Sequence, residues 1–309
     1  MSKSAHPCGV LFLDKPKGWT SRKAVNHVIH MFAKPEQKNR KQRPKAGHTG
    51  TLDPLATGML PILLGDATRF TSMGLNAEKS YEVSFDLSFQ TDTLDLEGEV
   101  LVRFENVNVT QAQVEETIAL FIGKIQQIPP VYSAIRVDGQ RAHKMARQGE
   151  DVVMKAREVE IKNITLLSVA GSVVTLRVDC TKGTYIRSLA RDIGAKLGLG
   201  GCVTALRRTS TGGWPAEMMV SIEELEEKKE SCILPLQMWL RDLTDVSLDK
   251  RDAKRFVQGQ RLPMTYDVQS DVLCCVTHDD WVLGTATFDP NKRVLQPERV
   301  LPTAQELLK

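Results

Sequence analysis

Long hydrophobic runs are scarce in this chain of 309 residues. The longest, GVLFL at 9–13 and LPILLG at 60–65, fall far short of the roughly 20 residues of a membrane-spanning helix, and of a signal peptide's core. We therefore expect a cytoplasmic protein with no membrane segment. Hydrophobic residues make up 41% of the chain and charged residues 26%, which is typical of a soluble globular protein with a sizeable core.

Patterns that hold metals or form disulfides are also missing. The six cysteines include no C-x-x-C pair, and the six histidines show neither H-E-x-x-H nor zinc-ribbon spacing. No phosphate-cradling P-loop, no Ser/His/Asp order and no glycosidase-like pair of carboxylates is visible. We expect reduced, buried thiols and no metal.

Charge is distributed unevenly along the chain. Residues 1–50 hold eleven Lys and Arg against two acids, a charge of +9, so the remainder must carry −6 to give the total of +3. The segment KPEQKNRKQRPK at 34–45 has six basic residues and no apolar anchor, which is typical of a solvated loop. Because Lys and Arg bind phosphates without reading sequence, we predict a polyanionic partner, with Lys38, Arg40 and Lys41 as contacts.

Hydrophobic periodicity predicts an α+β fold. The alternation of apolar residues favours strands, and Thr110-x-x-Gln113 is a capping box that opens a helix. Strands are expected at 9–13, 81–89, 159–167 and 172–180, and helices at 20–32, 111–122 and 185–197.

The sequence pattern changes after Asp242. A short helix near 249–257 ends at Gly259, and the runs VLCCVT and WVLGTATF then read as a compact β unit. We predict a larger domain at 1–245 and a small β-rich domain at 246–309.

The stretch GHTGTLDPLATG at 47–58 carries a single carboxylate, Asp53. Pro54 disfavours helical backbone at Asp53, and glycines on both sides permit tight turns. On pattern alone, an ordinary turn is the simpler interpretation. The alternative is a rigid loop that presents one acid.

Together with His48, this stretch resembles the catalytic motif of the bacterial TruB family of tRNA pseudouridine synthases. LDKPKGWTS at 13–21 resembles the family's opening motif, which packs beneath the catalytic loop, and 123–153 resembles the RNA-gripping insertion of its stand-alone members. The resemblance implies the pseudouridine synthase fold, with a mixed, largely antiparallel central sheet flanked by helices. It also implies that the C-terminal unit is a PUA-like RNA-binding domain.

The resemblance further implies an activity: isomerisation of the T-arm uridine of tRNA, position 55, to pseudouridine. The enzyme flips the base out, cleaves its glycosidic bond and rejoins it through C5. It needs no guide RNA and no obligatory protein partner, and because no atoms leave the nucleotide it needs no cofactor. Independently of the resemblance, we expect a monomer. Its route could be attack on the sugar, addition to C6 of the base, or a glycal.

The implied site residues are found by their motifs. Asp53 matches the catalytic carboxylate, Tyr81 in KSYEV the tyrosine that stacks on the uracil and takes part in proton transfer, and Arg187 in GTYIRS the arginine that pairs with the aspartate. Tyr185 and Leu206 would line the pocket and His48 would stack within the RNA loop. The candidates for phosphate contact in the insertion are Arg136, Arg141, His143, Lys144 and Arg147.

Alternatives remain at each level. On pattern alone, Tyr185 reads as a core aromatic, Arg187 as a charge on a helix surface and Leu206 as core filler. A guide-RNA-dependent pseudouridine synthase is a second possible function. A tRNA-binding or tRNA-folding chaperone, in which Asp53 is only a turn residue, is a third.

Overall fold

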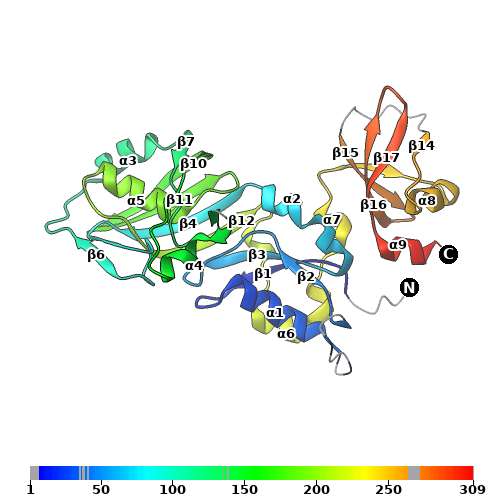
Figure 1. Ribbon diagram of the computed structural model, residues 1–309, viewed down its shortest axis with the longest axis horizontal. Coiled ribbons are helices and arrows are strands. Elements are labelled where there is room, and N and C mark those ends of the chain that lie inside the picture. Colours follow the sequence, from blue (N-terminus) through cyan, green and yellow to red (C-terminus); the bar gives the residue numbers. More distant parts are fainter. Residues whose placement is uncertain are drawn as a thin grey trace.

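The computed structural model describes residues 7–308, except 35, 37, 38, 40, 41, 134, 138 and 264–271; the side chains of His143 and Leu307 are also not described. Figure 1 shows a larger unit built on a long twisted sheet and a smaller β-rich unit that carries the C-terminus. No helix in the described part of the chain is both long and apolar enough to cross a membrane.

Eight strands form the central sheet, in the order β1-β3-β12-β4-β11-β10-β7, with β2 added beside β3. All neighbours are antiparallel except β3 and β12, which are parallel, so the prediction of a mixed, largely antiparallel sheet is confirmed. The strands are β1 Gly9–Lys15, β2 Ala46–His48, β3 Thr57–Leu64, β4 Lys79–Asp86, β7 Gly123–Gln127, β10 Arg157–Ala170, β11 Val173–Cys180 and β12 Cys202–Thr211.

Helices flank this sheet, as predicted. Thr20 caps the first by accepting a hydrogen bond from the backbone N–H of Lys23, and Thr110 and Gln113 form the predicted capping box of another. The helices of the larger unit are α1 Ser21–Phe32, the 3₁₀ helix η2 Gly65–Phe70, α2 Thr71–Asn76, α3 Gln111–Ala119, α4 Ala142–Arg147, α5 Ile186–Lys196, η3 Ala216–Met218, α6 Ile222–Lys228, η4 Lys229–Cys232 and α7 Leu236–Trp239.

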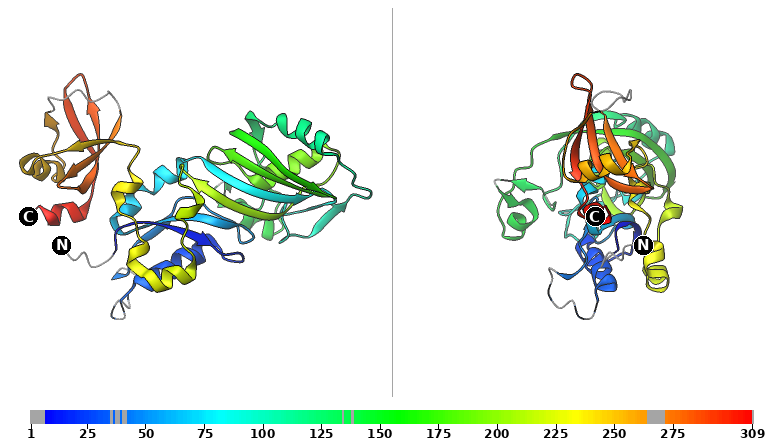
Figure 2. Two further views of the ribbon diagram at one scale, coloured as in Figure 1. Left: turned by 180° about the vertical axis from the view of Figure 1, so that it is seen from behind. Right: turned by 90° about the vertical axis from the view of Figure 1, so that its right-hand side faces the viewer.

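The smaller unit is built on a second sheet, in the order β13-β15-β16-β17-β14. This curled sheet agrees with the predicted PUA-like domain (Figure 2). Its first strand, β13, begins at Thr244 and crosses the predicted boundary between 245 and 246. The division of the chain at that point stays a prediction. Its elements are β13 Thr244–Ser247, α8 Lys250–Val257, β14 Leu262–Pro263, β15 Leu273–His278, β16 Trp281–Asp289, β17 Val294–Val300 and α9 Pro302–Leu307.

Two sequence-based boundaries were wrong. The strand expected to run to Phe89 ends at Asp86, because the Asp86 carboxylate accepts hydrogen bonds from the backbone and hydroxyl of Ser88 and turns the chain. Phe89 instead begins a hairpin, β5 Phe89–Thr91 with β6 Val100–Arg103. The helix expected to reach Ile122 ends at Ala119, and Ile122 is left 46% exposed.

Candidate active site

The loop that joins β2 to β3 carries Asp53. Gly50 and Gly58 bracket it with φ angles of +147° and +96°, which side chains rarely permit. A Cβ at Gly58 would lie 2.2 Å from the carbonyl oxygen of Arg208, so the close approach of β12 also requires glycine. The turn itself is closed by a 3.1 Å hydrogen bond from the Ala56 N–H to the Asp53 carbonyl.

The LDKPKGWTS segment packs against this loop, as the resemblance implied. The Ser21 hydroxyl donates to the Leu52 carbonyl and accepts from the Leu52 N–H, at 3.0 and 2.8 Å, and the Gly18 N–H donates to the Pro54 carbonyl at 2.8 Å. Lys15 is fully buried and donates to the carbonyls of its own turn, and burial lowers its pKa to about 8. These contacts hold the backbone on both sides of Asp53.

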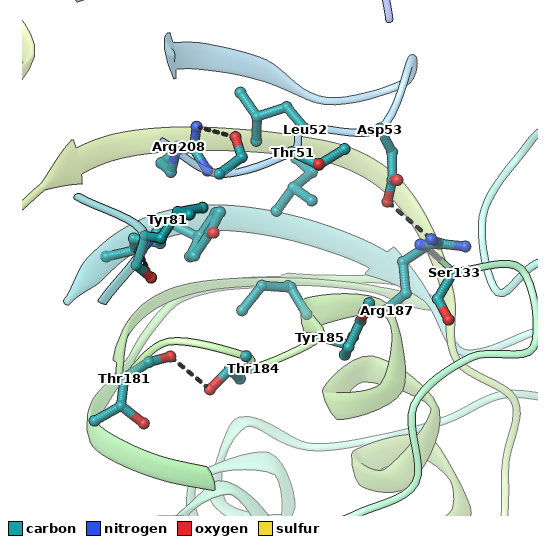
Figure 3. Close-up of a pocket in the computed structure, with 16 residues that line it drawn as sticks. Thr51, Leu52, Asp53, Tyr81, Ser133, Thr181, Thr184, Tyr185, Arg187 and Arg208 are labelled. Atoms are coloured by element: carbon teal, nitrogen blue, oxygen red, sulfur yellow. Dashed lines mark hydrogen bonds and ion pairs between the residues drawn. The ribbon is translucent and has the colours of Figure 1, made fainter. Parts of the chain in front are cut away.

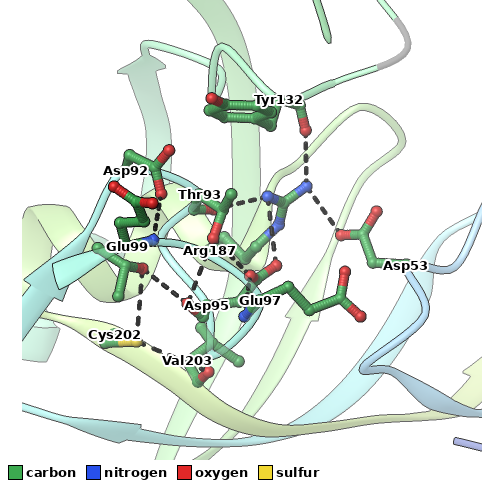
Figure 4. Close-up of polar contacts among 11 residues, drawn as sticks. Asp53, Asp92, Thr93, Asp95, Glu97, Glu99, Tyr132, Arg187, Cys202 and Val203 are labelled. Atoms are coloured by element: carbon green, nitrogen blue, oxygen red, sulfur yellow. Dashed lines mark hydrogen bonds and ion pairs between the residues drawn. The ribbon is translucent and has the colours of Figure 1, made fainter. Parts of the chain in front are cut away.

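Arg187 pairs with Asp53. The guanidinium lies on the first turn of α5, is 6% exposed, and places Nη2 2.9 Å from Oδ2 of Asp53 (Figure 4). Its other donors reach the carbonyl oxygens of Thr93 at 2.6 Å and Tyr132 at 3.0 Å. The carboxylate itself is 38% exposed, so one side remains open to a ligand. The interpretation of Arg187 as a surface charge is therefore wrong.

A second carboxylate, Asp95, also lies against Arg187, with Oδ2 3.4 Å from Nη1. Asp95 is buried, and its other oxygen accepts from the Thr93 hydroxyl at 2.6 Å and the Glu97 N–H at 3.0 Å. Asp53 and Asp95 thus share one buried arginine. The buried Asp95 fixes the orientation in which Arg187 meets the more exposed Asp53.

Replacing Asp95 with Asn should weaken both fold and activity. The amide cannot balance the charge of Arg187, and removing one partner of a buried ion pair costs about 3 kcal/mol of the free energy of unfolding. Displacement of Arg187 should lower the single-turnover rate of the reaction proposed below about 10-fold to 100-fold. Urea denaturation and a single-turnover assay measure the two effects.

Asp92→Asn is the matched control, because Asp92 belongs to the same acidic loop but its carboxylate accepts from the backbone N–H of Glu99 and from the Tyr132 phenol, which an Asn oxygen can also do. Equal effects of the two substitutions would show that the loop, and not the ion pair with Arg187, is responsible.

A cavity of about 330 Å³ opens beside Asp53 (Figure 3). Its volume is at the lower end of the range for small-ligand pockets. Strands β4 and β12 form one wall and the start of α5 the other. Of the predicted site residues, it brings together Asp53, Tyr81, Tyr185, Arg187 and Leu206.

Both tyrosines of the cavity are at least partly shielded from water. Tyr81 is 7% exposed, and burial raises the pKa of its phenol. Burial likewise raises the pKa of the Tyr185 phenol. The backbone of Tyr185 is fixed by the Gln127 side chain, which accepts from its N–H at 2.8 Å and donates to its carbonyl at 3.2 Å. Both phenols are therefore neutral at physiological pH.

The other predicted residues lie outside this cavity. His48 is on β2, where its Nδ1 accepts from the Gly50 N–H at 3.3 Å and burial lowers the pKa of its imidazole. Arg147 lines a wider adjoining cavity of about 770 Å³ that also reaches Asp53 and Arg187. Arg136, Arg141 and Lys144 are exposed and line neither. The side chain of His143, and Lys38, Arg40 and Lys41, lie outside the described residues.

Sequence reasoning missed two basic side chains in the cavity wall. Arg208 is 1% exposed and Lys79 is 8% exposed, and both line the cavity. Lys79 donates to three carbonyls at the end of α2, and burial lowers its pKa to about 8. Strand alternation could have found them, because residues two apart share a face: Lys79 with Tyr81, and Arg208 with Leu206.

No group of three or more His, Cys, Asp or Glu side chains that could hold a metal ion occurs among the described residues. The six cysteine thiols are all free, and all but that of Cys8 are buried, as expected.

This sheet, with a carboxylate paired to an arginine at a pocket lined by tyrosines, defines a pseudouridine synthase. Residues 37–186 match the family described as TruB family pseudouridylate synthase (N terminal domain). Residues 187–243 match the tRNA pseudouridylate synthase B C-terminal domain. The chain belongs to the TruB family.

Proteins named tRNA pseudouridine synthase B are similar over nearly their whole length. The one from Ralstonia pickettii (strain 12J) is 41% identical over 313 aligned positions, covering 95% of this chain and 94% of the relative. The one from Burkholderia mallei (strain NCTC 10247) is 39% identical, covering 96% and 97%.

Solved structures support the same fold. A chain of a Cbf5-Nop10-Gar1 complex superposes with a TM-score of 0.70 at 24% identity, over 95% of this chain and 85% of that one. A chain of an H/ACA RNP bound to a substrate RNA containing 2′-deoxyuridine gives the same TM-score at 22% identity, over 96% and 86%.

Proposed function

We propose that the protein is a stand-alone tRNA pseudouridine synthase that converts the T-arm uridine, position 55, to pseudouridine. The observation that carries the proposal is the ion pair of Asp53 and Arg187 at the mouth of a cavity lined by Tyr81, Tyr185 and Leu206. The names of the relatives that cover nearly the whole chain support tRNA as the substrate.

The chemistry needs an acidic oxygen at the sugar and an enclosed place for the detached base. Asp53 has one carboxylate oxygen oriented by Arg187 and a partly exposed side chain, so it is placed to meet C1′ or C6 of a flipped uridine. Arg187, held by two carbonyls and Asp95, keeps that orientation while charge on Asp53 changes. No atoms leave the nucleotide, so the reaction consumes no cofactor.

The cavity wall supplies the remaining roles. The ring of Tyr81 would stack on the uracil, which offsets part of the stacking lost when the base leaves the RNA. Its neutral phenol can take part in proton transfer to the detached base and from C5. Leu206 and Tyr185 would exclude water and keep the free base from escaping.

RNA binding is assigned to the basic insertion, to His48 and to the small β-rich domain. Arg147 lines the cavity that continues from Asp53, so a phosphate held there would lie next to the flipped nucleotide. His48 would stack in the RNA loop in place of displaced bases. We assign the catalytic domain to 1–245, the PUA-like domain to 246–309, and a cytoplasmic, monomeric state to the whole.

Removing the exposed basic residues of the insertion should flatten the salt dependence of RNA binding. If Arg141, Lys144 and Arg147 each contact a phosphate, their joint replacement by Ala should reduce the slope of log Kd against log salt by about 2. Fluorescence anisotropy at several salt concentrations gives the slope. Lys196→Ala, an exposed lysine at the end of α5, is the control that should leave it unchanged.

The guide-dependent alternative rests on the superposition with a chain of an H/ACA RNP, which at 22% identity shows the fold alone. Insertion 123–153 favours stand-alone activity, because its Arg147 and Tyr132 border the cavity at Asp53. A minimal RNA separates the two. The purified protein, with no guide RNA, should release tritium from a T-arm hairpin labelled at C5 of its uridines.

An anticodon-arm hairpin with the same label should release none. Turnover of the T-arm hairpin only after addition of a guide RNA would favour the second function, whereas binding without turnover would favour the chaperone.

A further inference from the structure

Arg208 and Tyr81 face each other across neighbouring strands. They are directly paired in the register of β12 and β4, so their side chains point to the same face of the sheet. Figure 3 shows both in the wall of the cavity at Asp53. The paired positions bring a buried guanidinium beside the phenol that the proposed reaction uses.

The guanidinium also ties the two ends of the catalytic loop. Nε of Arg208 donates to the Met59 carbonyl at 2.6 Å, and Nη2 donates to the Gly50 carbonyl at 3.1 Å. Asp53 lies between these two anchor points. A lysine could not supply donors in two directions from one rigid plane.

Within the described part of the chain, the charge of Arg208 is not paired with a carboxylate. Among the described residues, none of the ion pairs involves it, although it is 1% exposed. A buried cation that is hydrogen-bonded only to neutral groups favours negative charge nearby. The surrounding cavity is where negative charge develops in the proposed reaction.

The positive charge of Arg208 acts on the Tyr81 phenol. The other titratable groups that act on its phenol are the Cys180 thiol from β11 and the Asp53 carboxylate, and both raise its pKa, as burial does. The charge of Arg208 lowers the pKa of this phenol. The charge of Arg208 therefore acts against burial, Cys180 and Asp53, because it stabilises the phenolate.

We propose that Arg208 is a positioning residue of the isomerisation, which acts by stabilising a transient Tyr81 phenolate. The inference rests on the proposed function. When the glycosidic bond breaks, its electron pair leaves with N1 of the base, and the phenol proton passes to N1. After the base has turned and the C1′–C5 bond has formed, the C5 proton returns to the phenolate oxygen. The phenol is restored and the base has exchanged a proton at C5 for one at N1.

The test measures Tyr81 directly. Difluorotyrosine replaces the four tyrosines of the RNA-free protein, and ¹⁹F NMR follows the phenol of residue 81, assigned by its loss in Tyr81→Phe. Arg208→Gln should raise the pH midpoint of this signal by about one unit or more. It should also lower the single-turnover rate about 100-fold while RNA affinity changes little.

Arg207→Gln is the matched control, because Arg207 is the next residue but points to the other face, where it pairs with Asp14 at 2.7 Å. It should leave the midpoint unchanged. Arg208→Lys is the second variant if Arg208→Gln does not fold: it keeps a charge but not both carbonyl contacts, so the midpoint should stay near that of the unsubstituted protein and the rate should fall far less than the about 100-fold expected for Arg208→Gln.

Equal midpoints in Arg208→Gln and the unsubstituted protein would overturn the proposal and leave Arg208 only as the tie between Gly50 and Met59. A raised midpoint in Arg208→Lys as large as that expected for Gln would do the same. If the unsubstituted protein forms no pseudouridine in the hairpin, the proposed function fails, but the midpoints still report whether Arg208 acts on Tyr81.

Discussion

Asp53→Asn should abolish pseudouridine formation and leave RNA binding almost intact. Asn has the size of Asp and can still accept a hydrogen bond from Arg187, so the loop between Gly50 and Gly58 keeps its shape. It cannot act as an anionic oxygen towards the sugar or base. Loss of such a group lowers the single-turnover rate by about 10⁴-fold or more.

Two measurements on one RNA separate the effects: anisotropy gives Kd, and tritium release from C5 of the T-arm uridine gives the rate. Asp242→Asn, at an acid whose side chain is 81% exposed, is the control and should change neither. A rate within about 10-fold of the unsubstituted protein would exclude Asp53 as the reacting carboxylate, since general electrostatic effects alone account for changes of that size.

Arg187→Lys should damage both activity and stability. The guanidinium joins Asp53 and Asp95 and reaches two backbone carbonyls, and one ammonium cannot span these four partners. With Asp95 left buried and poorly paired, the free energy of unfolding should fall by about 3 kcal/mol. The rate should fall about 10³-fold, because the carboxylate of Asp53 loses its fixed orientation.

Arg191→Lys tests the same change one helical turn later. Arg191 is partly exposed, pairs with Asp192 at 2.8 Å and donates to the Ile128 carbonyl, so its replacement should cost less than about 1 kcal/mol. Urea denaturation of both variants gives the comparison. If Arg187→Lys is no less stable than Arg191→Lys, the ion pairs with Asp53 and Asp95 do not contribute as described.

Local patterns were enough to predict much of the fold. The capping box at Thr110 and Gln113 forms as expected, because it depends only on residues three apart. The alternation from Tyr81 to Phe85 predicts β4 for a similar reason. Pro54 and the glycines around Asp53 predicted a turn or a rigid loop, and only the resemblance to the TruB family favoured a site there; in the structure this loop is anchored at both ends.

The features that the sequence did not reveal depend on contacts between segments far apart in the chain. Asp95 reads as one acid among several in a loop, and only the docking of α5 brings Arg187 against it. Arg208 could have been placed on the face of Leu206, but its pairing with Tyr81 requires the register of β12 on β4. The end of β4 at Asp86 comes from a side-chain turn that strand alternation does not reveal.

The central claim is that Asp53 belongs to a guide-independent pseudouridine synthase acting on the T-arm of tRNA. The most direct measurement maps pseudouridine in a full-length, unmodified tRNA transcript after incubation with the purified protein alone. We predict one pseudouridine, at the T-arm uridine, and none in a transcript with cytidine there. An unmodified transcript, or modification only at another uridine, would contradict the account.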